Sequence, residues 1–353
     1  MVDPLKQPKL YPSLFLGKNE GYISFGAGQP DLPPPKEVYD DLHLYNSFQY
    51  GLIRGEQKLR EKVAIAHKVQ PDDVFITNGA SEALQLSLYA CQGKSVLLTK
   101  PYYYSYPPLV EFAKKQPVYT NLVQGKINYD NVEKKLQNKE ADAILINSPA
   151  NPTGCVETPT TLKKIESLTH DLNIPFIFDE VYSDLIYQGE HYSPRKENVI
   201  CIHSFSKTFS LCGVRVGYLY TKNAELLQQM ADWKTHTSMN TSLYSQAMAL
   251  NTFKVPPSYI KKQLTIWQER RNHMAEGLEK IGLDFWSPEG AFYVMPKVPN
   301  PTKFAEDMFF KHKLICYLGE WFGAPQRVRF SYATTVENIE KGLKIVEKYL
   351  ATK

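Results

Sequence analysis

Short apolar runs with the length of strands alternate with helix-like segments between about residues 36 and 222 of this chain. The apolar run at residues 143–147, for example, is followed by a helix-like segment from Pro159 to Leu172. Strands that alternate with helices usually form a parallel sheet, because each helix carries the chain back across it. The pattern therefore predicts an α/β fold, with a mostly parallel sheet and helices on both faces.

The pattern changes after residue 256, where a long charged and amphipathic stretch begins at Pro257. Its apolar residues have helical spacing, namely Ile260, Leu264, Trp267, Met274 and Leu278. Residues 327–332 are strand-like, and a helix with the apolar stripe Ile339, Leu343, Val346 and Leu350 follows them. Thr334 and Glu337 fit a capping box at its start. We therefore expect a large domain of residues 29–256 and a small α+β domain of residues 257–353.

The composition narrows the classes of function. The chain of 353 residues has 41 basic and 37 acidic residues and no long basic run, so nucleic-acid binding is not indicated. No apolar stretch approaches the ~20 residues of a membrane span. The N-terminus has no apolar signal-like region, so we expect a cytoplasmic protein. The five cysteines show no C-x-x-C spacing, which favours reduced thiols and no metal site.

Lys207 lies in the run of residues 204–215, which begins with Ser204 and ends with Arg215. A lysine that must condense with an aldehyde cofactor needs a lowered pKa, because only the neutral amine attacks a carbonyl. Arg215 suits a phosphate, which a guanidinium can bind through two parallel hydrogen bonds. The alternative for Lys207 is an ordinary solvated surface charge.

A phosphate could also bind where the apolar run at residues 74–77 breaks at Asn78 and Gly79. Ser81 then opens an amphipathic stretch, which makes this a strand, a glycine turn and the N-terminus of a helix. The free backbone amides of Ala80 and Ser81 would point at an anion. The alternative is an ordinary capped helix.

Polar groups follow two further strand-like runs. Asn151 comes after residues 143–147 in a turn between two prolines, where its side-chain amide could donate a hydrogen bond. Asp179 ends the apolar run of residues 175–178, and a carboxylate there is costly unless it meets a cation or a strong donor. A protonated pyridine nitrogen would be such a partner. The alternatives are a purely structural turn at Asn151 and a salt bridge from Asp179 to an arginine.

The tyrosines of residues 102–106 follow the strand-like run at residues 95–99, and one of their rings could stack on a flat heterocycle. With 23 tyrosines in the chain, packing alone could also explain the cluster. All of these groups lie at the carboxyl ends of predicted strands, the edge at which open α/β sheets bind ligands. Together they predict a pyridoxal phosphate site.

The chain resembles the class I/II aminotransferases of the aspartate aminotransferase superfamily, which are fold-type I pyridoxal phosphate enzymes. The resemblance rests on S-x-S-K at Lys207 with an arginine eight residues later, on N-P-T-G at residues 151–154, on D-E-V-Y at residues 179–182 and on R-F-S-Y-A-T from Arg329. These motifs cover almost the whole chain in order. The resemblance implies that residues 1–28 pack with the C-terminal domain, and that the active site lies between the domains at a dimer interface.

The resemblance also implies a role for each matched residue. Lys207 would form the Schiff base, and Asp179 would pair with the pyridine nitrogen. Tyr182 and Asn151 would donate to the phenolate oxygen of the ring, on which Tyr103 would stack. Arg329, helped by the backbone of Gly28, would bind the α-carboxylate of the substrate. The phosphate would be held by Ala80, Ser81, Ser204 and Arg215, and by Tyr50 of the neighbouring subunit.

The expected activity is therefore a ping-pong transamination, in which an L-α-amino acid passes its amino group to a 2-oxo acid. By resemblance, glutamate and 2-oxoglutarate form one pair. The side-chain pocket would include residues 11–16, residues 102–106 and Phe292, and its tyrosines favour broad or aromatic donors. One alternative is a C–S lyase or another elimination enzyme with the same site. A more remote one is a non-enzymatic regulator built on the same fold.

Overall fold

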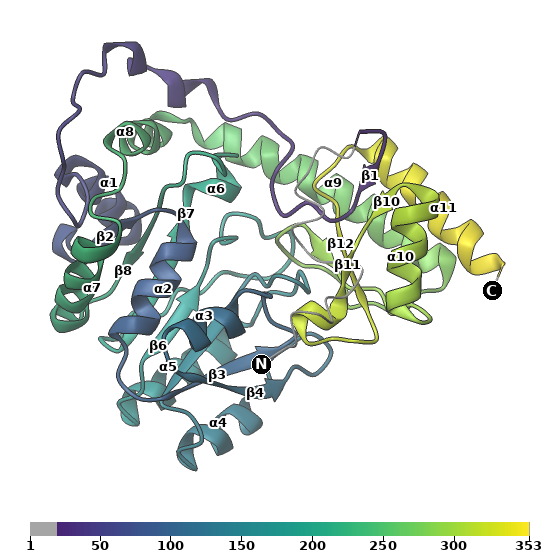
Figure 1. Cartoon of the computed structure of the whole chain (residues 1–353), viewed down its shortest axis with the longest axis horizontal. Coiled ribbons are helices and arrows are strands. Elements are labelled where there is room, and N and C mark those ends of the chain that lie inside the picture. Colours follow the sequence, from purple (N-terminus) through teal and green to yellow (C-terminus); the bar gives the residue numbers. More distant parts are fainter. Residues whose placement is uncertain (1–19, 353) are drawn as a thin grey trace.

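The structure is a computed structural model that describes residues 20–352. Its larger part is built on a seven-stranded sheet with the strand order β2-β8-β7-β6-β5-β3-β4 (Figure 1). The strands are β2 (Val74–Thr77), β3 (Ser95–Lys100), β4 (Gln116–Asn121), β5 (Ala143–Asn147), β6 (Phe176–Asp179), β7 (Val199–Ser204) and β8 (Gly217–Tyr220).

The sheet is mostly parallel, which confirms the prediction. β3 pairs in parallel with β4 and β5, and β6 pairs in parallel with β5 and β7. β8 runs antiparallel to its neighbours β2 and β7. Because every strand except β8 therefore points the same way, their carboxyl ends meet at one edge of the sheet, where ligands of such sheets bind.

Helices cover both faces of this sheet. One face packs against α1 (Gln57–His67), α4 (Tyr129–Gln137), α5 (Pro159–Asp171) and α8 (Leu243–Asn251). The other packs against α2 (Ala80–Ala90), α3 (Tyr106–Phe112) and α7 (Ala224–Thr237). Alternate residues of the central strands enter the two cores, as Phe178 and Ile177 of β6 do. A strand that is buried on both faces reads as a continuous apolar run, which explains the sequence pattern.

The C-terminal elements form the smaller part of the molecule. The helix α9 (Pro257–Ile281) leads to it from the large sheet (Figure 1). A three-stranded antiparallel sheet has the order β11-β12-β9, formed by β9 (Tyr293–Val294), β11 (Tyr317–Leu318) and β12 (Val328–Ser331). Near the start of the described chain, β1 (Ile23–Ser24) pairs in parallel with β10 (Leu314–Ile315). The helices α10 (Pro301–His312) and α11 (Val336–Ala351) complete this part.

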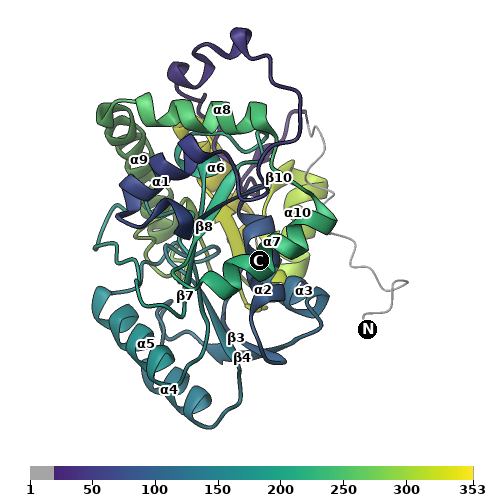
Figure 2. The same cartoon turned by 90° about the vertical axis from the view of Figure 1, so that its left-hand side faces the viewer.

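The core of the smaller part also includes Tyr182 and Leu185, which follow β6 of the large sheet. Phe25 belongs to the same core. The two parts therefore meet at the carboxyl edge of the large sheet. A segment with short 3₁₀ helices at Lys36–Tyr39 and Leu42–Leu44 extends beside α8 at one end of the molecule (Figure 2).

Two predicted helix starts differ from the structure. α2 begins at Ala80 and not at Ser81, because Gly79 adopts a positive φ of 77° and turns the chain one residue earlier. The capping box predicted for Thr334 and Glu337 is wrong. Thr335 has extended backbone angles, and its side chain accepts a hydrogen bond from the Asn338 N–H at 3.2 Å. α11 therefore begins at Val336.

Within residues 20–352, no helix has the length and apolar character that crossing a membrane requires.

Candidate active site

Lys207 lies in the short helix α6 (Phe205–Thr208), directly after β7. Ser204 caps this helix, since its Oγ accepts a hydrogen bond from the Ser206 N–H at 3.1 Å. Lys207 Nζ donates to the backbone oxygen of Gly28 at 2.5 Å. The amine lies 5.9 Å from the ring centre of Tyr182. The large sheet and the segment near Gly28 therefore meet at this lysine.

The surroundings of Lys207 favour the neutral amine. Burial lowers the pKa of Lys207, and the positive charges of Arg329 and Arg215 lower it further, against the raising effects of Cys212 and Asp179. The hydrogen-bond acceptor is a carbonyl and not a carboxylate, so the contact at Gly28 does not demand a charged lysine. A neutral buried amine is a nucleophile and a proton acceptor.

Asp179 ends β6 and is buried. Its Oδ2 accepts a hydrogen bond from the Tyr106 hydroxyl at 2.7 Å, and its Oδ1 accepts one from the Val181 N–H at 3.2 Å. Burial raises the pKa of Asp179 to about 6, although both of these hydrogen bonds act to lower it. A cationic partner would compensate this buried carboxylate, and a protonated ring nitrogen is such a partner.

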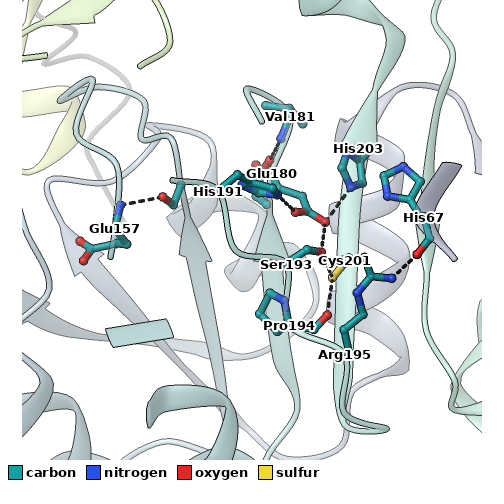
Figure 3. A network of polar contacts seen from close by, with 12 residues as sticks. His67, Glu157, Glu180, Val181, His191, Ser193, Pro194, Arg195, Cys201 and His203 are labelled. Atoms are coloured by element: carbon teal, nitrogen blue, oxygen red, sulfur yellow. Dashed lines mark hydrogen bonds and ion pairs between the residues drawn. The ribbon is translucent and has the colours of Figure 1, made fainter. Parts of the chain in front are cut away.

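Glu180, the next residue, is enclosed by its own partners on the other side of the chain (Figure 3). Its carboxylate lies 2.6 Å from Nε2 of both His191 and His203, and it accepts hydrogen bonds from Ser193 and Tyr220 at 2.9 and 3.0 Å. Burial alone would raise the pKa of Glu180, but the two histidines hold it well below its usual value. Glu180 is thus satisfied by the protein itself, which leaves Asp179 as the acid that a ligand could reach.

The turn between β2 and α2 lies against Arg215. The Arg215 Nη2 donates to the Asn78 oxygen at 3.4 Å, and its Nη1 donates to the Cys212 oxygen at 3.0 Å. A Cβ on Gly79 would lie 2.5 Å from Nη2 of Arg215, so only glycine allows the guanidinium to approach this closely. The structure therefore brings Arg215 to the N-terminus of α2.

The first turn of α2 offers free backbone donors beside this guanidinium. Ala80 is half-buried and Ser81 is exposed. A Cβ on Gly217 would lie 2.8 Å from the backbone nitrogen of Ala80, which shows how closely β8 supports the helix end. Unpaired N–H groups at a helix N-terminus attract an anion, and the adjacent guanidinium adds a positive charge. This arrangement suits a phosphate.

Arg329, on β12, has a side chain that is only 1% exposed. Its Nη1 donates to Asn151 Oδ1 at 3.0 Å, and its Nη2 donates to the Gly26 oxygen at 2.8 Å. Its buried Nε has no hydrogen-bond partner among the described residues. The guanidinium carbon lies 4.4 Å from the ring centre of Tyr293 and 4.5 Å from that of Tyr317. A buried guanidinium with an unused donor suits a carboxylate ligand.

Three further residues of the predicted site are tyrosines. The ring of Tyr103 packs edge-on against Tyr106, the partner of Asp179, at 5.4 Å. The hydroxyl of Tyr182 lies 2.9 Å from that of Tyr293. Tyr50 lies apart on the segment before α1, and its side chain is 81% exposed. The pocket expected at residues 11–16 lies outside the described residues.

These groups fit pyridoxal phosphate. The buried amine of Lys207 could meet its aldehyde, the carboxylate of Asp179 its ring nitrogen, and the α2 terminus with Arg215 its phosphate. Glycine at positions 79 and 217 is what lets Arg215 and β8 lie this close to the start of α2.

Sequence reasoning missed two tyrosines. Tyr106 was noted only as part of a cluster, yet it holds Asp179, and Tyr293 contacts both Tyr182 and Arg329. The sequence gives a weak signal for Tyr106, because it lies three residues after Tyr103, about one turn of a helix. Nothing near Tyr293 in the sequence indicates that it faces Tyr182, which is 111 residues away.

The chain is similar to known proteins along nearly its whole length. The family model "Aminotransferase class I and II" matches residues 20–346. A probable aspartate aminotransferase of Methanocaldococcus jannaschii is 30% identical over 97% of each chain. The solved aspartate aminotransferase of Thermotoga maritima superposes with a TM-score of 0.89 at 31% identity, over 96% of this chain and 95% of that one. The solved aromatic aminotransferase of Pyrococcus horikoshii also superposes with a TM-score of 0.89, at 28% identity, over 97% of this chain and 99% of that one.

The family model covers most of the chain, and a relative at 30% identity matches along 97% of it. The chain therefore belongs to the class I and II aminotransferases, the pyridoxal phosphate-dependent transaminases of fold-type I.

Proposed function

We propose that this aminotransferase holds pyridoxal phosphate at the carboxyl edge of the large sheet. Lys207 would bind the aldehyde, Asp179 the ring nitrogen, and Tyr182 and Asn151 the phenolate oxygen, while Tyr103 would stack on the ring. The phosphate would lie at Ala80, Ser81, Ser204 and Arg215. The observation that carries the proposal is the buried amine of Lys207, which has a lowered pKa and donates its hydrogen bond to a carbonyl.

The chain's own groups would share the work of the reaction. Pyridoxal phosphate supplies an electron sink for the carbanion that an amino acid leaves when it loses its Cα proton. Lys207 would accept that proton and deliver it to the carbon that carried the aldehyde, as transamination requires. Asp179 would keep a proton on the ring nitrogen. Arg329 and the backbone at Gly28 would hold the substrate carboxylate, so that the Cα–H bond faces Lys207.

We propose aspartate and aromatic amino acids as donors and 2-oxoglutarate as an acceptor. Relatives named for aspartate and for aromatic substrates both resemble the chain along nearly its full length. The rings of Tyr293, Tyr317 and Phe322 around Arg329 add apolar surface close to the carboxylate site, which would suit an aromatic side chain.

We further propose a homodimer in which Tyr50 completes the phosphate site of the neighbouring subunit, as its 81% exposure allows. The separate core around β9 to β12 supports the division into domains of residues 29–256 and 257–353. Phe25 belongs to that core, which supports the placement of segment 1–28 with the second domain as far as residues 20–28 are described. Five free cysteines, four of them buried, support a reducing compartment such as the cytoplasm.

The test is the visible absorption spectrum of the purified protein loaded with pyridoxal phosphate, recorded before and after single additions of L-amino acids. We expect the band of the lysine-bound cofactor to form, and aspartate and aromatic amino acids to convert it to the pyridoxamine form. Release of ammonia with pyruvate from a donor would instead indicate elimination. If no band forms, the proposed role of Lys207 is wrong.

A further inference from the structure

A buried lysine outside the residues discussed so far lies behind the N-terminus of α2. Lys234 belongs to α7, and its side chain is 0% exposed. Its Nζ lies 2.5 Å from Oε2 of Glu82 and donates to Ser238 Oγ at 3.1 Å. Glu82 is in the first turn of α2, with a side chain that is 12% exposed. Two helices that pack together are thus joined by a buried ion pair.

Glu82 also contacts the turn before α2. Its Oε2 accepts a hydrogen bond from the Asn78 N–H at 2.6 Å, and its Oε1 accepts one from Asn78 Nδ2 at 3.1 Å. The oxygen of Asn78 in turn accepts from Nη2 of Arg215. A continuous chain of polar contacts therefore runs from Lys234 in α7 to Arg215 beside the anion site.

The charges in this series of polar contacts matter as much as its geometry. Burial would raise the pKa of Glu82, but Lys234 and the donors around the carboxylate lower it overall, so Glu82 carries a negative charge at neutral pH. A carboxylate in the first turn of α2 repels an anion at the same helix end. Lys234 offsets this charge, and without it the carboxylate would remain buried and uncompensated.

We propose that Lys234 is a positioning residue for the cofactor phosphate. It cancels the charge of Glu82 and holds the Asn78–Gly79 turn, so that the α2 amides and Arg215 face the phosphate together. The inference rests on the proposed function, since it assumes that the phosphate binds at this helix end. The phosphate, and not the ring or the aldehyde, is the part of the cofactor that should sense Lys234.

The test compares pyridoxal phosphate with pyridoxal, which lacks the phosphate, as ligands of purified cofactor-free protein. Lys234→Met keeps the length of the side chain and removes its charge. We expect this variant to bind pyridoxal phosphate about tenfold or more weakly than the wild type, which is the size of effect for one charge near the ligand. The dissociation constant of pyridoxal should change by less than about twofold. Binding is followed by the visible band, independently of turnover.

Two further variants separate charge from packing. Lys234→Arg keeps the charge and should retain most of the affinity for pyridoxal phosphate. The double variant Glu82→Gln with Lys234→Met removes both charges and leaves an amide oxygen for the Asn78 N–H. It should recover affinity to within about threefold of the wild type, because the repulsive carboxylate is gone.

If Lys234→Met lost affinity for pyridoxal and for pyridoxal phosphate by the same factor, the site would be loosened in general, and the inference would be overturned. An unchanged affinity for pyridoxal phosphate would also overturn it, as would a double variant that is no better than Lys234→Met. If the wild-type protein binds neither ligand, the proposed function fails instead, and the two failures are thereby distinguished.

Discussion

At the scale of single residues, the site depends on buried charges whose usual partners are replaced by neutral groups. Lys207 donates to a carbonyl, and Asp179 accepts from a phenol and a backbone amide. Each charged form is poorly compensated, so burial lowers the pKa of the lysine and raises that of the aspartate. A ligand that brings a cationic nitrogen to Asp179 and an aldehyde to Lys207 would relieve both costs.

Lys207→Ala should abolish turnover and the visible band of the bound cofactor. One positioned acid–base group typically contributes about 10² to 10⁴ in rate, and Lys207 would also be the covalent anchor. The measurement is initial-rate transamination together with the absorption spectrum, with the exposed Lys222→Ala as the matched control. A variant that kept half of the wild-type rate would exclude Lys207 from this role.

Arg329→Leu should raise KM for amino donors while the cofactor band still forms. Loss of a buried partner of a charged ligand typically costs ~2–5 kcal/mol, which corresponds to a weakening of at least about thirtyfold. Arg327→Leu is the matched control, because Arg327 pairs with Asp284 near the same strand. An unchanged KM would remove Arg329 from the substrate site.

At the scale of elements, the end of α1 is fixed against the large sheet by a group that must stay neutral. The Nε2 of His67, the last residue of α1, lies 2.8 Å from the Tyr218 hydroxyl, and its ring packs on His203 at 4.4 Å. Burial, together with the charge of His203, lowers the pKa of His67 to about 3, although Glu180 acts in the opposite direction. Protonation of this residue therefore opposes folding.

This predicts how stability depends on pH. Between about pH 6.5 and pH 3 the unfolded chain binds a proton at His67 that the folded chain does not, so the free energy of unfolding should fall as the pH falls. His67→Gln removes this proton and should reduce the difference in stability between pH 7 and pH 5. Urea unfolding at both pH values measures it, with the exposed His170→Gln as control. An equally steep loss in His67→Gln would contradict the assignment.

Most elements were predictable because each has a local signal. The strands of the large sheet are apolar runs, and α9 begins at Pro257 as predicted, since proline suits the first turn of a helix. The start of α11 was not predictable in detail. Threonine is a favoured N-cap residue and occurs at both positions 334 and 335, but only Thr334 has a glutamate three residues later. The backbone angles at Thr335 nevertheless make its hydroxyl the one that accepts the helix amide.

At the scale of the whole molecule, the site is assembled from segments that are distant in sequence. Gly28 meets Lys207 across 179 residues, and Arg329 meets Gly26 across 303. Arg270 of α9 further fixes the segment after Gly28, because its guanidinium pairs with Asp31 at 2.6 and 3.1 Å. Arg329 on β12 and Lys207 on α6 therefore come from different parts of the molecule, and their separation depends on how those parts pack.

Tyr50→Phe tests the proposed dimer. The hydroxyl would complete the phosphate site of the neighbouring subunit, so its loss should weaken pyridoxal phosphate by about tenfold, the usual scale for a hydrogen bond to a charged group. The stability of the cofactor-free protein should not change, because the side chain is 81% exposed. Cofactor titration measures the affinity, urea unfolding measures the stability, and sedimentation gives the oligomeric state. A fully active monomer would contradict the shared site.

The sequence by itself determined the order of strands and helices along the chain and indicated candidate residues at the ends of its strands, because apolar periodicity, glycine turns and strand-end polar groups are local properties. The roles of Arg329, Gly28 and Tyr50 came only from the resemblance to a family. Only the tertiary structure decided which of these groups meet. The hydrogen bond from Tyr106 to Asp179, the enclosure of Glu180 by two histidines and the ion pair between Lys234 and Glu82 all join residues more than ten positions apart. Such contacts depend on the packing of helices against the sheet, and no local pattern encodes their geometry.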